Sequence, residues 1–219
     1  MKGSINLEGA RCIIICAGEL TVSNINVNEN EMVIAVDGGF DYCDFLKITP
    51  DAVIGDFDSL SDEGLRKLKV YEEQGGNVIS LPVIKDDTDT IYAVKYALEE
   101  GFKRIELFAA SGGRLDHTIA NIQTLLFIKE HGALGYLMEG GSMTFVIQNE
   151  KVSFKNISGM FSVFSLGECA KGVDITGGKY ELKDGVLKDS FPLGISNEFT
   201  DKPCEIRVKE GKLLCIVYY

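Results

Sequence analysis

The stretch DAVIGDFDSLSDEGLRKLKVYEEQGGNVISLP, residues 51–82, decides the fold. It begins with an apolar strand that ends on two aspartates, Asp56 and Asp58. Segment 61–76 has acidic residues in its first turn and two glycines at its end, which predicts a helix. A second strand is expected at 77–82. A strand, a helix and another strand in this order are typical of a parallel sheet with helices packed on it.

Strands and helices alternate over the whole first part of the chain. Short apolar or β-branched segments predict four more strands, at 12–16, 32–39, 104–110 and 134–139. Apolar residues with helical spacing predict two more helices, at 87–101 (Ile91, Val94 and Leu98) and at 116–132 (Ile119, Ile122 and Leu126). This alternation indicates a mainly parallel sheet that helices cover on both faces.

Beyond about residue 140, helical stripes give way to short β-rich segments between glycine-bearing turns. These segments are 142–148, 159–166, 204–211 and 212–219. The last two predict a terminal hairpin around Glu210 and Gly211. The predicted fold is therefore α/β, with an N-terminal parallel-sheet α/β domain, residues 1–138, followed by a C-terminal antiparallel β-sandwich domain, residues 139–219.

Composition excludes several classes of protein. The 219 residues carry a formal net charge of -11 and no run of basic residues longer than a pair, so we expect no nucleic-acid partner. No apolar stretch approaches the ~20 residues of a membrane span, and the N-terminus lacks a secretory pattern, so we expect no membrane partner. Six cysteines without metal-binding spacing indicate buried thiols in a reduced, cytoplasmic protein.

Aspartates gather where the predicted strands end. They are Asp37, Asp56, Asp58, Asp86, Asp87, Asp89 and Asp116. Because the carboxyl ends of parallel strands line the crevice where ligands bind, these side chains should converge. Carboxylates without matching cations repel one another, and Mg²⁺ with phosphate ligands would offset this repulsion. The sequence therefore predicts a magnesium site.

Aspartate also forms turns and helix caps, which is the other interpretation of each position. We prefer this local role for Asp41, Asp44 and Asp62. Either Asp86 or Asp87 can cap the helix that follows. Asp58 is expected to cap the helix at 61–76, which leaves Asp56 to be explained by a ligand. In an extended segment both carboxylates would point to one side and Phe57 to the other, into the core.

The stretch SGGRLDHTIAN, residues 111–121, is a second candidate for chemistry. Its glycines allow a close approach of backbone N–H groups, Arg114 can bind phosphate oxygens, and a helix begins near Asp116. These features predict a phosphate cradle, although a flexible loop capped by Asp116 fits equally well. His117 could act as a base or simply belong to the helix, and His131 suits a helix C-terminus. Neither a Walker loop nor a GxGxxG motif is present.

Four motifs together resemble the thiamine pyrophosphokinase family. They are VDGG (36–39), PDAVIGDFDSL (50–60), KDDTDT (85–90) and SGGRLDHTIANI (111–122), and GGKYEL (177–182) and LGISNEF (193–199) resemble that family's second domain. The resemblance spans most of the chain. It implies an enzyme that converts ATP and thiamine into thiamine diphosphate and AMP. It also implies a homodimer whose thiamine pockets form between subunits.

The resemblance also implies roles for individual residues. Asp56, Asp58 and Asp89 would bind Mg²⁺. Near the nucleotide it places Asp37, Gly38, Gly39, Asp86, Asp87, Thr88, Gly113, Arg114 and Asp116. Ser196 and Asn197 would contact thiamine. Some relatives have tryptophan at the position of Tyr180, and because this chain has no tryptophan, another ring must make any aromatic contact with thiamine.

The implied mechanism is attack of the thiamine hydroxyl on the β-phosphorus of ATP. Arg114 would stabilise the developing charge, and Asp116 or Asp37 could accept the hydroxyl proton. Two alternatives stay open: another Mg²⁺-dependent nucleotide hydrolase or small-alcohol kinase on the same fold, and a non-enzymatic thiamine or nucleotide sensor. Release of AMP rather than ADP would separate a diphosphate transfer from a kinase that moves one phosphoryl group.

Overall fold

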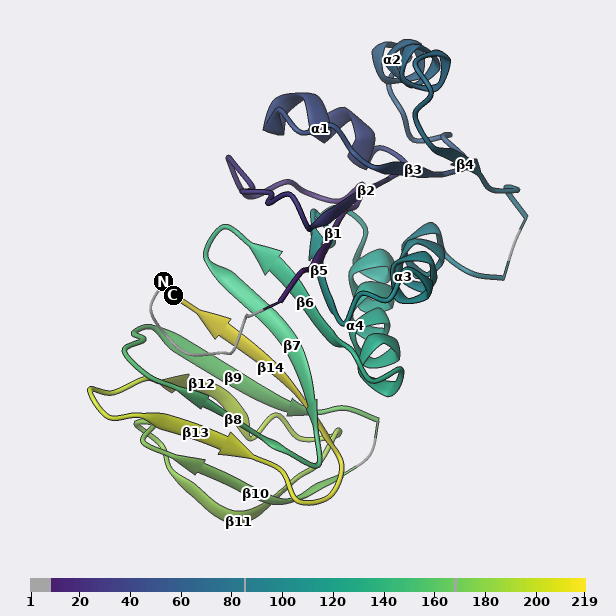
Figure 1. The fold of residues 1–219 in the computed structure, drawn as a ribbon. Helices are drawn as coiled ribbons and strands as arrows, with labels where there is room; N and C mark the ends of the chain where they lie inside the picture. The colour runs from purple at the N-terminus through teal and green to yellow at the C-terminus, as the bar shows by residue number, and fades with distance from the viewer. Residues whose placement is uncertain (1–8, 85, 168) are drawn as a thin grey trace. The chain divides into compact units, whose positions relative to one another are not determined.

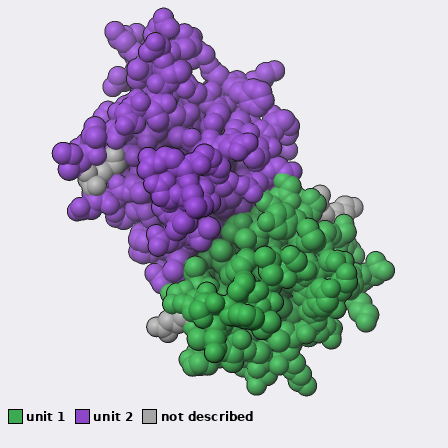
Figure 2. Space-filling view, turned by 180° about the vertical axis from the view of Figure 1, so that it is seen from behind, with its two compact units in different colours: residues 1–8, 141–219 green, residues 9–140 purple. Residues whose placement is uncertain are grey.

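The computed structural model describes residues 9–84, 86–167 and 169–219, and its secondary structure is drawn in Figure 1. The chain divides into two compact units, residues 9–140 and residues 141–219, which Figure 2 distinguishes. The division falls two residues after the expected boundary at 138. Residues 1–8 of the expected first domain, and Lys85 of the KDDTDT motif, lie outside the described residues.

Unit 9–140 is built on six strands in the order β4-β3-β2-β1-β5-β6. Their bounds are β1 Cys12–Ile15, β2 Met32–Val36, β3 Ala52–Gly55, β4 Val78–Ser80, β5 Arg104–Phe108 and β6 Leu134–Glu139. All five neighbouring pairs are parallel. The predicted parallel sheet is confirmed, and its carboxyl ends therefore lie along one edge.

Helices cover both faces of this sheet. Their bounds are α1 Gly39–Leu46, α2 Asp62–Glu73, α3 Asp89–Glu99 and α4 Leu115–Glu130. Figure 1 shows α1 and α2 on one face and α3 and α4 on the other. Apolar side chains of α1 and α2 pack on the strands in one buried cluster that includes Phe40, Leu68 and Ile15. Helix α1 was not predicted, because its eight residues follow directly on the VDGG motif and are too few for a periodic stripe.

The helix caps differ from the prediction. Ser61 caps α2 by accepting a hydrogen bond from the backbone N–H of Gly64 at 2.9 Å. Thr88 caps α3 by accepting one from Ile91 at 3.2 Å. Asp58 and the aspartates before Thr88 are therefore not the caps, since each helix uses the hydroxyl residue immediately before its first turn. This frees Asp58 for another role.

The buried face of α4 also differs from the predicted stripe. Its buried residues are Asn121, Thr124, Leu125 and Ile128, whereas Ile119 is 50% exposed. Apolar residues lie on more than one side of this helix, so spacing alone could not select the buried face. The side-chain amide of Asn121 donates to the carbonyl of Ala110 at 2.7 Å, which satisfies a polar group in the buried position.

The eight strands of unit 141–219 pair antiparallel in two sets of four that belong to different sheets, in the orders β12-β9-β14-β7 and β11-β10-β13-β8. The bounds are β7 Ser142–Gln148, β8 Lys151–Phe154, β9 Met160–Ser165, β10 Ala170–Thr176, β11 Leu182–Leu187, β12 Gly194–Glu198, β13 Cys204–Arg207 and β14 Lys212–Tyr218. Aromatic contacts join the sheets: the ring of Phe154 lies 6.5 Å from Phe145 and 5.2 Å from Phe199. The predicted β-sandwich is confirmed.

The predicted terminal hairpin is wrong. Strand β13 pairs with β10 and β8, whereas β14 pairs with β7 and β9 in the other sheet. The turn at Glu210 and Gly211 therefore carries the chain from one layer of the sandwich to the other. A hairpin and such a crossing have the same local sequence signature, and only the pairing partners distinguish them. In the described part of the chain, no helix is long and apolar enough to cross a membrane.

A buried ionic cluster ties the strands of the first unit together. The side chain of Glu106 on β5 is only 1% exposed and lies between the guanidinium groups of Arg11 and Arg104. The Nε of Arg104 donates to Glu106 at 3.0 Å, and the Nε of Arg11 donates to Glu31 at 2.9 Å. A buried carboxylate in this position depends on both cations to offset its desolvation.

Glu106→Gln should therefore lower the free energy of unfolding by about 3 kcal/mol, since it leaves two partly buried guanidinium groups without their shared anion. Denaturant titration followed by circular dichroism measures the change. Glu63→Gln is the matched control, because its pairs with Arg66 and Lys67 are exposed and should contribute less than about 1 kcal/mol. Equal effects of the two variants would contradict the structural role of the cluster.

Candidate active site

A cavity of about 790 Å³ lies in unit 9–140 at the carboxyl ends of the parallel strands. Its lining includes seven of the predicted site residues: Asp37, Asp56, Asp58, Thr88, Asp89, Gly113 and Arg114. The structure thus brings together four separate motifs at the edge of the sheet where ligands of open α/β folds bind. Among the residues described around the cavity, Gly38, Gly39, Asp86, Asp87 and Asp116 are not part of the lining.

Asp37 is the most strongly perturbed carboxylate of the cavity. Burial raises its pKa to about 7, and the negative charges of Asp89 and Asp56 add to this rise. The backbone N–H of Phe57 partly compensates by donating to Asp37 at 3.1 Å. A Cβ atom at Gly55 would lie 1.8 Å from the Asp37 carboxylate, so only glycine leaves room for it. The cavity therefore holds mutually repelling acids in a fixed arrangement.

Asp56 and Asp58 reach the cavity through a turn and not through an extended strand. Strand β3 ends at Gly55, and Phe57 adopts the left-handed conformation with φ of 65°. The backbone N–H of Asp58 donates to the side chain of Asp56 at 3.3 Å. The predicted strand alternation is thus wrong, although Phe57 does pack against the core cluster and both carboxylates line the cavity.

The donor set of the cavity suits a hard divalent cation. Asp37, Asp56 and Asp89 interact electrostatically, and Asp58 lines the same space. Among the described residues, no three histidine, cysteine, aspartate or glutamate side chains form a complete metal-binding group. A site of one or two carboxylates completed by phosphate and water oxygens is how Mg²⁺ is usually held with nucleotides, so these residues fit it.

The glycine-rich loop also lines this cavity, through Gly112, Gly113 and Arg114. Gly112 and Gly113 have φ of 77° and 61°, and a Cβ atom at Gly113 would meet open space. Arg114 occupies the cap position of α4, and its Nη2 lies 2.6 Å from the carboxylate of Asp116. This hydrogen-bonded pair raises the pKa of Arg114 and lowers the pKa of Asp116. Asp116 is thus in the first turn of α4 and is not its cap.

Other predicted residues have structural contacts. Gly39 begins α1 where a Cβ atom would lie 2.0 Å from the carbonyl oxygen of Ile15, and the N–H of Gly38 donates to Ser59 Oγ at 3.0 Å. Asp87 forms an ion pair with Lys95. Asp41 accepts hydrogen bonds of 3.1 Å from the N–H and hydroxyl of Ser61, so its preferred local role agrees with the structure.

The sequence reasoning missed the segment Cys16–Glu19 and Asn121, which also line the cavity. A Cβ atom at Gly18 would lie 2.4 Å from the carbonyl oxygen of Ser111, so the two loops pass each other closely. A glycine directly after β1 was the available signal, because the first strand of a parallel sheet often ends at the ligand.

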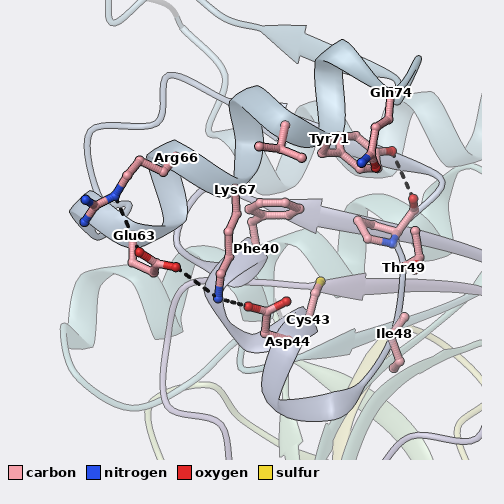
Figure 3. Close-up of a pocket in the computed structure, with 12 residues that line it drawn as sticks. Phe40, Cys43, Asp44, Ile48, Thr49, Glu63, Arg66, Lys67, Tyr71 and Gln74 are labelled. Carbon is pink, nitrogen blue, oxygen red and sulfur yellow. Dashed lines mark hydrogen bonds and ion pairs between the residues drawn. The ribbon is translucent and has the colours of Figure 1, made fainter.

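A second cavity, of about 480 Å³, lies between α1 and α2 (Figure 3). Phe40 and Cys43 contribute to its apolar wall, and Lys67 extends from α2 to pair with Asp44 on α1. Lys67 also lies 3.7 Å from Glu63, so acids and bases are matched here. The excess of carboxylates distinguishes the first cavity as the candidate active site.

The two predicted thiamine contacts lie in unit 141–219, on β12. Ser196 is exposed and has a left-handed backbone with φ of 58°. Asn197 is buried, and its side chain is hydrogen-bonded to the backbone of Tyr180. A ligand can therefore reach the side chain of Ser196, whereas the side chain of Asn197 is already hydrogen-bonded within the chain.

Two family models match the chain, one within each unit. The thiamin pyrophosphokinase catalytic domain matches residues 24–134, and the thiamin pyrophosphokinase vitamin B1 binding domain matches residues 146–213. The chain belongs to the thiamin pyrophosphokinase family. The predicted family and the predicted enzyme activity are thereby confirmed. The enzyme is a transferase that acts in the biosynthesis of thiamine diphosphate.

Individual members of the family are similar along most of their length. Thiamine pyrophosphokinase of Bacillus subtilis is 27% identical over 191 residues, 86% of this chain and 88% of that protein. Its crystal structure superposes with a TM-score of 0.84 at 24% identity, over 96% of this chain and 99% of that one. The Geobacillus thermodenitrificans structure gives 0.84 at 25% identity, over 96% and 98%. Yeast thiamin pyrophosphokinase gives 0.74 at 18% identity, over 98% and 87%.

The raised pKa of Asp37 predicts a pH-dependent stability in the presence of a metal chelator. The unfolded chain releases this proton near pH 3.9, whereas the folded chain keeps it until about pH 7. The contribution of this carboxyl group to the free energy of unfolding is therefore largest below about pH 3.9 and is lost as the pH rises to about 7. Asp37→Asn should raise the thermal midpoint at pH 8 by about 2 to 4 °C, and the gain should shrink towards pH 4.

Thermal unfolding scans across this pH range measure the difference. Asp62→Asn, in the exposed first turn of α2, is the control and should show no comparable pH-dependent gain. A gain for Asp37→Asn that does not vary with pH would contradict the electrostatic origin of the effect.

Proposed function

We propose that the enzyme transfers the diphosphate of ATP to the hydroxyl of thiamine and releases AMP, with Mg²⁺ as cofactor. The observation that carries this proposal is the meeting of Asp56, Asp58 and Asp89 with the Gly112–Arg114 loop around one cavity. Carboxylates for a cation and backbone N–H groups for phosphates are the two elements that bind a nucleotide triphosphate. Both lie in the unit that the catalytic-domain model matches.

Asp56, Asp58 and Asp89 are the carboxylates proposed to hold Mg²⁺. Because no three of the described side chains form a metal-binding group, one or two of them would bind the ion directly and the rest through its water. When bound, Mg²⁺ would neutralise phosphate charge and orient the β-phosphorus for in-line attack. Asp89 is the first residue of α3, so the N-terminus of this helix lies at the proposed cation site. Asp37 lines the same cavity and interacts electrostatically with Asp89 and Asp56, and this repulsion favours arrival of the cation together with ATP.

The loop at Gly112 and Gly113 is the proposed phosphate cradle. Its left-handed glycines and the N-terminus of α4 direct backbone N–H groups towards an anion. The guanidinium of Arg114 is exposed, and among the described residues it pairs with Asp116 alone, so phosphate oxygens can compete for it. Gly38, Gly39, Asp86 and Asp87 would then support the nucleotide site from outside the lining.

For the proton of the thiamine hydroxyl we favour Asp37 over Asp116. Asp37 lines the cavity, and burial raises its pKa, which strengthens it as a base. Asp116 lies outside the lining, and its lowered pKa makes it a weak base. The expected reaction is therefore proton transfer to Asp37 as the new bond to phosphorus forms.

Thiamine is proposed to bind through unit 141–219, with Ser196 as one contact. Tyr180 is the proposed aromatic ring. Its side chain is 60% exposed, and the ammonium of Lys179 lies 5.6 Å from the ring centroid. The ring face is thus accessible to a cation, and thiamine carries a permanent positive charge on its thiazolium ring.

A homodimer is proposed as the working form, with the thiamine pockets between its subunits. Three residues in the turn before β12 and at its start are apolar and exposed: Phe191 (62%), Leu193 (53%) and Ile195 (55%). A tight turn joins the first two, since the N–H of Leu193 donates to the carbonyl of Phe191 at 2.9 Å, and the three residues are called the apolar row. Such rows mark association surfaces, and a twofold dimer is the commonest way to cover one. A cytoplasmic location is proposed because all six cysteines are free thiols.

The decisive experiment mixes the purified chain with ATP, Mg²⁺ and thiamine and separates the nucleotides. We expect AMP and thiamine diphosphate in equal amounts. ADP would indicate a small-alcohol kinase, phosphate release without thiamine a hydrolase, and calorimetric binding without turnover a sensor.

Asp56→Asn and Asp58→Asn should each lower kcat/KM by on the order of 10²–10³ at limiting Mg²⁺, because each removes a charge that holds the cation. Asp62→Asn is the matched control and should retain wild-type turnover. Steady-state rates across a Mg²⁺ series measure the effect. Near wild-type turnover of both site variants would sink the metal-site proposal.

Sedimentation velocity tests the dimer. The wild type should sediment as twice its monomer mass, and Leu193→Asp, which places a charge in the apolar row, should shift the population towards monomers. Leu65→Asp, an exposed leucine on α2, is the control and should leave the mass unchanged. A monomeric wild type at assay concentrations would refute the proposed form.

A further inference from the structure

The side chain of Asn197 is buried and makes most of its hydrogen bonds to the backbone of Tyr180. It is 4% exposed, its Oδ1 accepts from the N–H of Tyr180 at 3.0 Å, and its Nδ2 donates to the carbonyl of Tyr180 at 2.7 Å. Its Oδ1 also accepts from the N–H of Glu198 at 2.9 Å. An amide has two donor hydrogens and two acceptor lone pairs, so three of its four capacities are used within the chain.

The segment that Asn197 holds is also fixed from both sides. The N–H of Lys179 donates to the carbonyl of Glu198 at 2.9 Å, and Gly178 forms a bridge with Phe199. A Cβ atom at Gly178 would lie 3.1 Å from Asn197 Oδ1, so the amide fills the space that this glycine leaves. The backbone of Tyr180 is therefore clamped although its ring is largely exposed.

The same amide lies beside a strained turn. Pairing of β12 with β9 shifts register between Gly194 and Asn197, and Ser196 within this bulge has φ of 58°. The N–H of Ser196 donates to the buried hydroxyl of Ser162 at 3.0 Å. Strained conformations of this kind persist only where the surroundings fix them, and here the hydrogen bond to Ser162 holds Ser196, while Asn197 binds the backbone of Glu198 directly after the bulge.

We propose that Asn197 is a positioning residue of the thiamine site and does not touch the substrate. Its amide holds the backbone of Tyr180 so that the ring is presented beside Ser196. A direct contact with thiamine would have to break bonds to Tyr180 and leave its buried N–H and carbonyl unsatisfied. This replaces the expected role of Asn197 as a contact, and it rests on the proposed binding of thiamine by unit 141–219.

A double-mutant cycle tests the proposal. Asn197→Ala should raise the KM for thiamine about 10-fold, with kcat and the KM for ATP within about twofold of wild type, because the ring loses its fixed placement. In a Tyr180→Ala background the same change should alter the KM for thiamine by less than about twofold, since no ring remains to be positioned. A direct contact would instead give the same factor in both backgrounds, and that result would overturn the proposal.

Hydrogen exchange supplies a readout that does not depend on activity. Asn197→Ala should speed amide exchange at residues 178–181 in the ligand-free protein, with the β7 and β14 amides unchanged. Asn197→Asp, which keeps the acceptors but loses the donor to Tyr180, serves as the second variant if the alanine protein does not fold. Unchanged exchange at 178–181 in the folded variant would overturn the clamp. If the wild type makes no AMP, the proposed function fails while exchange still decides the clamp.

Discussion

Mutual repulsion among carboxylates is the constraint on which the first unit depends. A parallel sheet directs the ends of its strands to one edge, and this chain places Asp37, Asp56, Asp58 and Asp89 there. Burial, and next to it the negative charges of Asp89 and Asp56, raise the pKa of Asp37, so holding these acids together costs free energy. The packed sheet and the room left by Gly55 hold the acids in place, which would give the proposed cation a prepared site. The acids thus lower the free energy of unfolding, and the proposed cation would offset this cost.

In the second unit, buried hydrogen bonds fix the backbone of residues whose side chains are exposed. Its aromatic core joins two sheets, and from that rigid base the chain presents Ser196 and the ring of Tyr180. Neither side chain is packed, yet both backbones are fixed by buried hydrogen bonds of Ser162 and Asn197. Buried polar side chains with satisfied hydrogen bonds therefore fix the position of the residues on this surface.

Failures of sequence-based prediction in this chain have physical causes. Helix α1 was missed because eight residues do not establish a period. The predicted stripe of α4 is not its most buried face, because apolar residues lie on several sides of this helix. Ser61 displaced Asp58 as a cap, since both types satisfy an open N–H and only the start of the helix selects between them. Strand alternation through Phe57 failed because a turn begins one residue after β3.

The sequence by itself determined the family, the α/β and β-sandwich classes, and the identity of the acids and glycines, because motif spacing and hydrophobic period are local properties of the chain. Only the tertiary structure decided which residues share the cavity, how Asp56 and Asp58 enter it, and which partners strands β13 and β14 take. It also showed that Asn197 is buried whereas its neighbour Ser196 is exposed. Burial and hydrogen-bond partners come from segments distant in sequence, and no local pattern contains them.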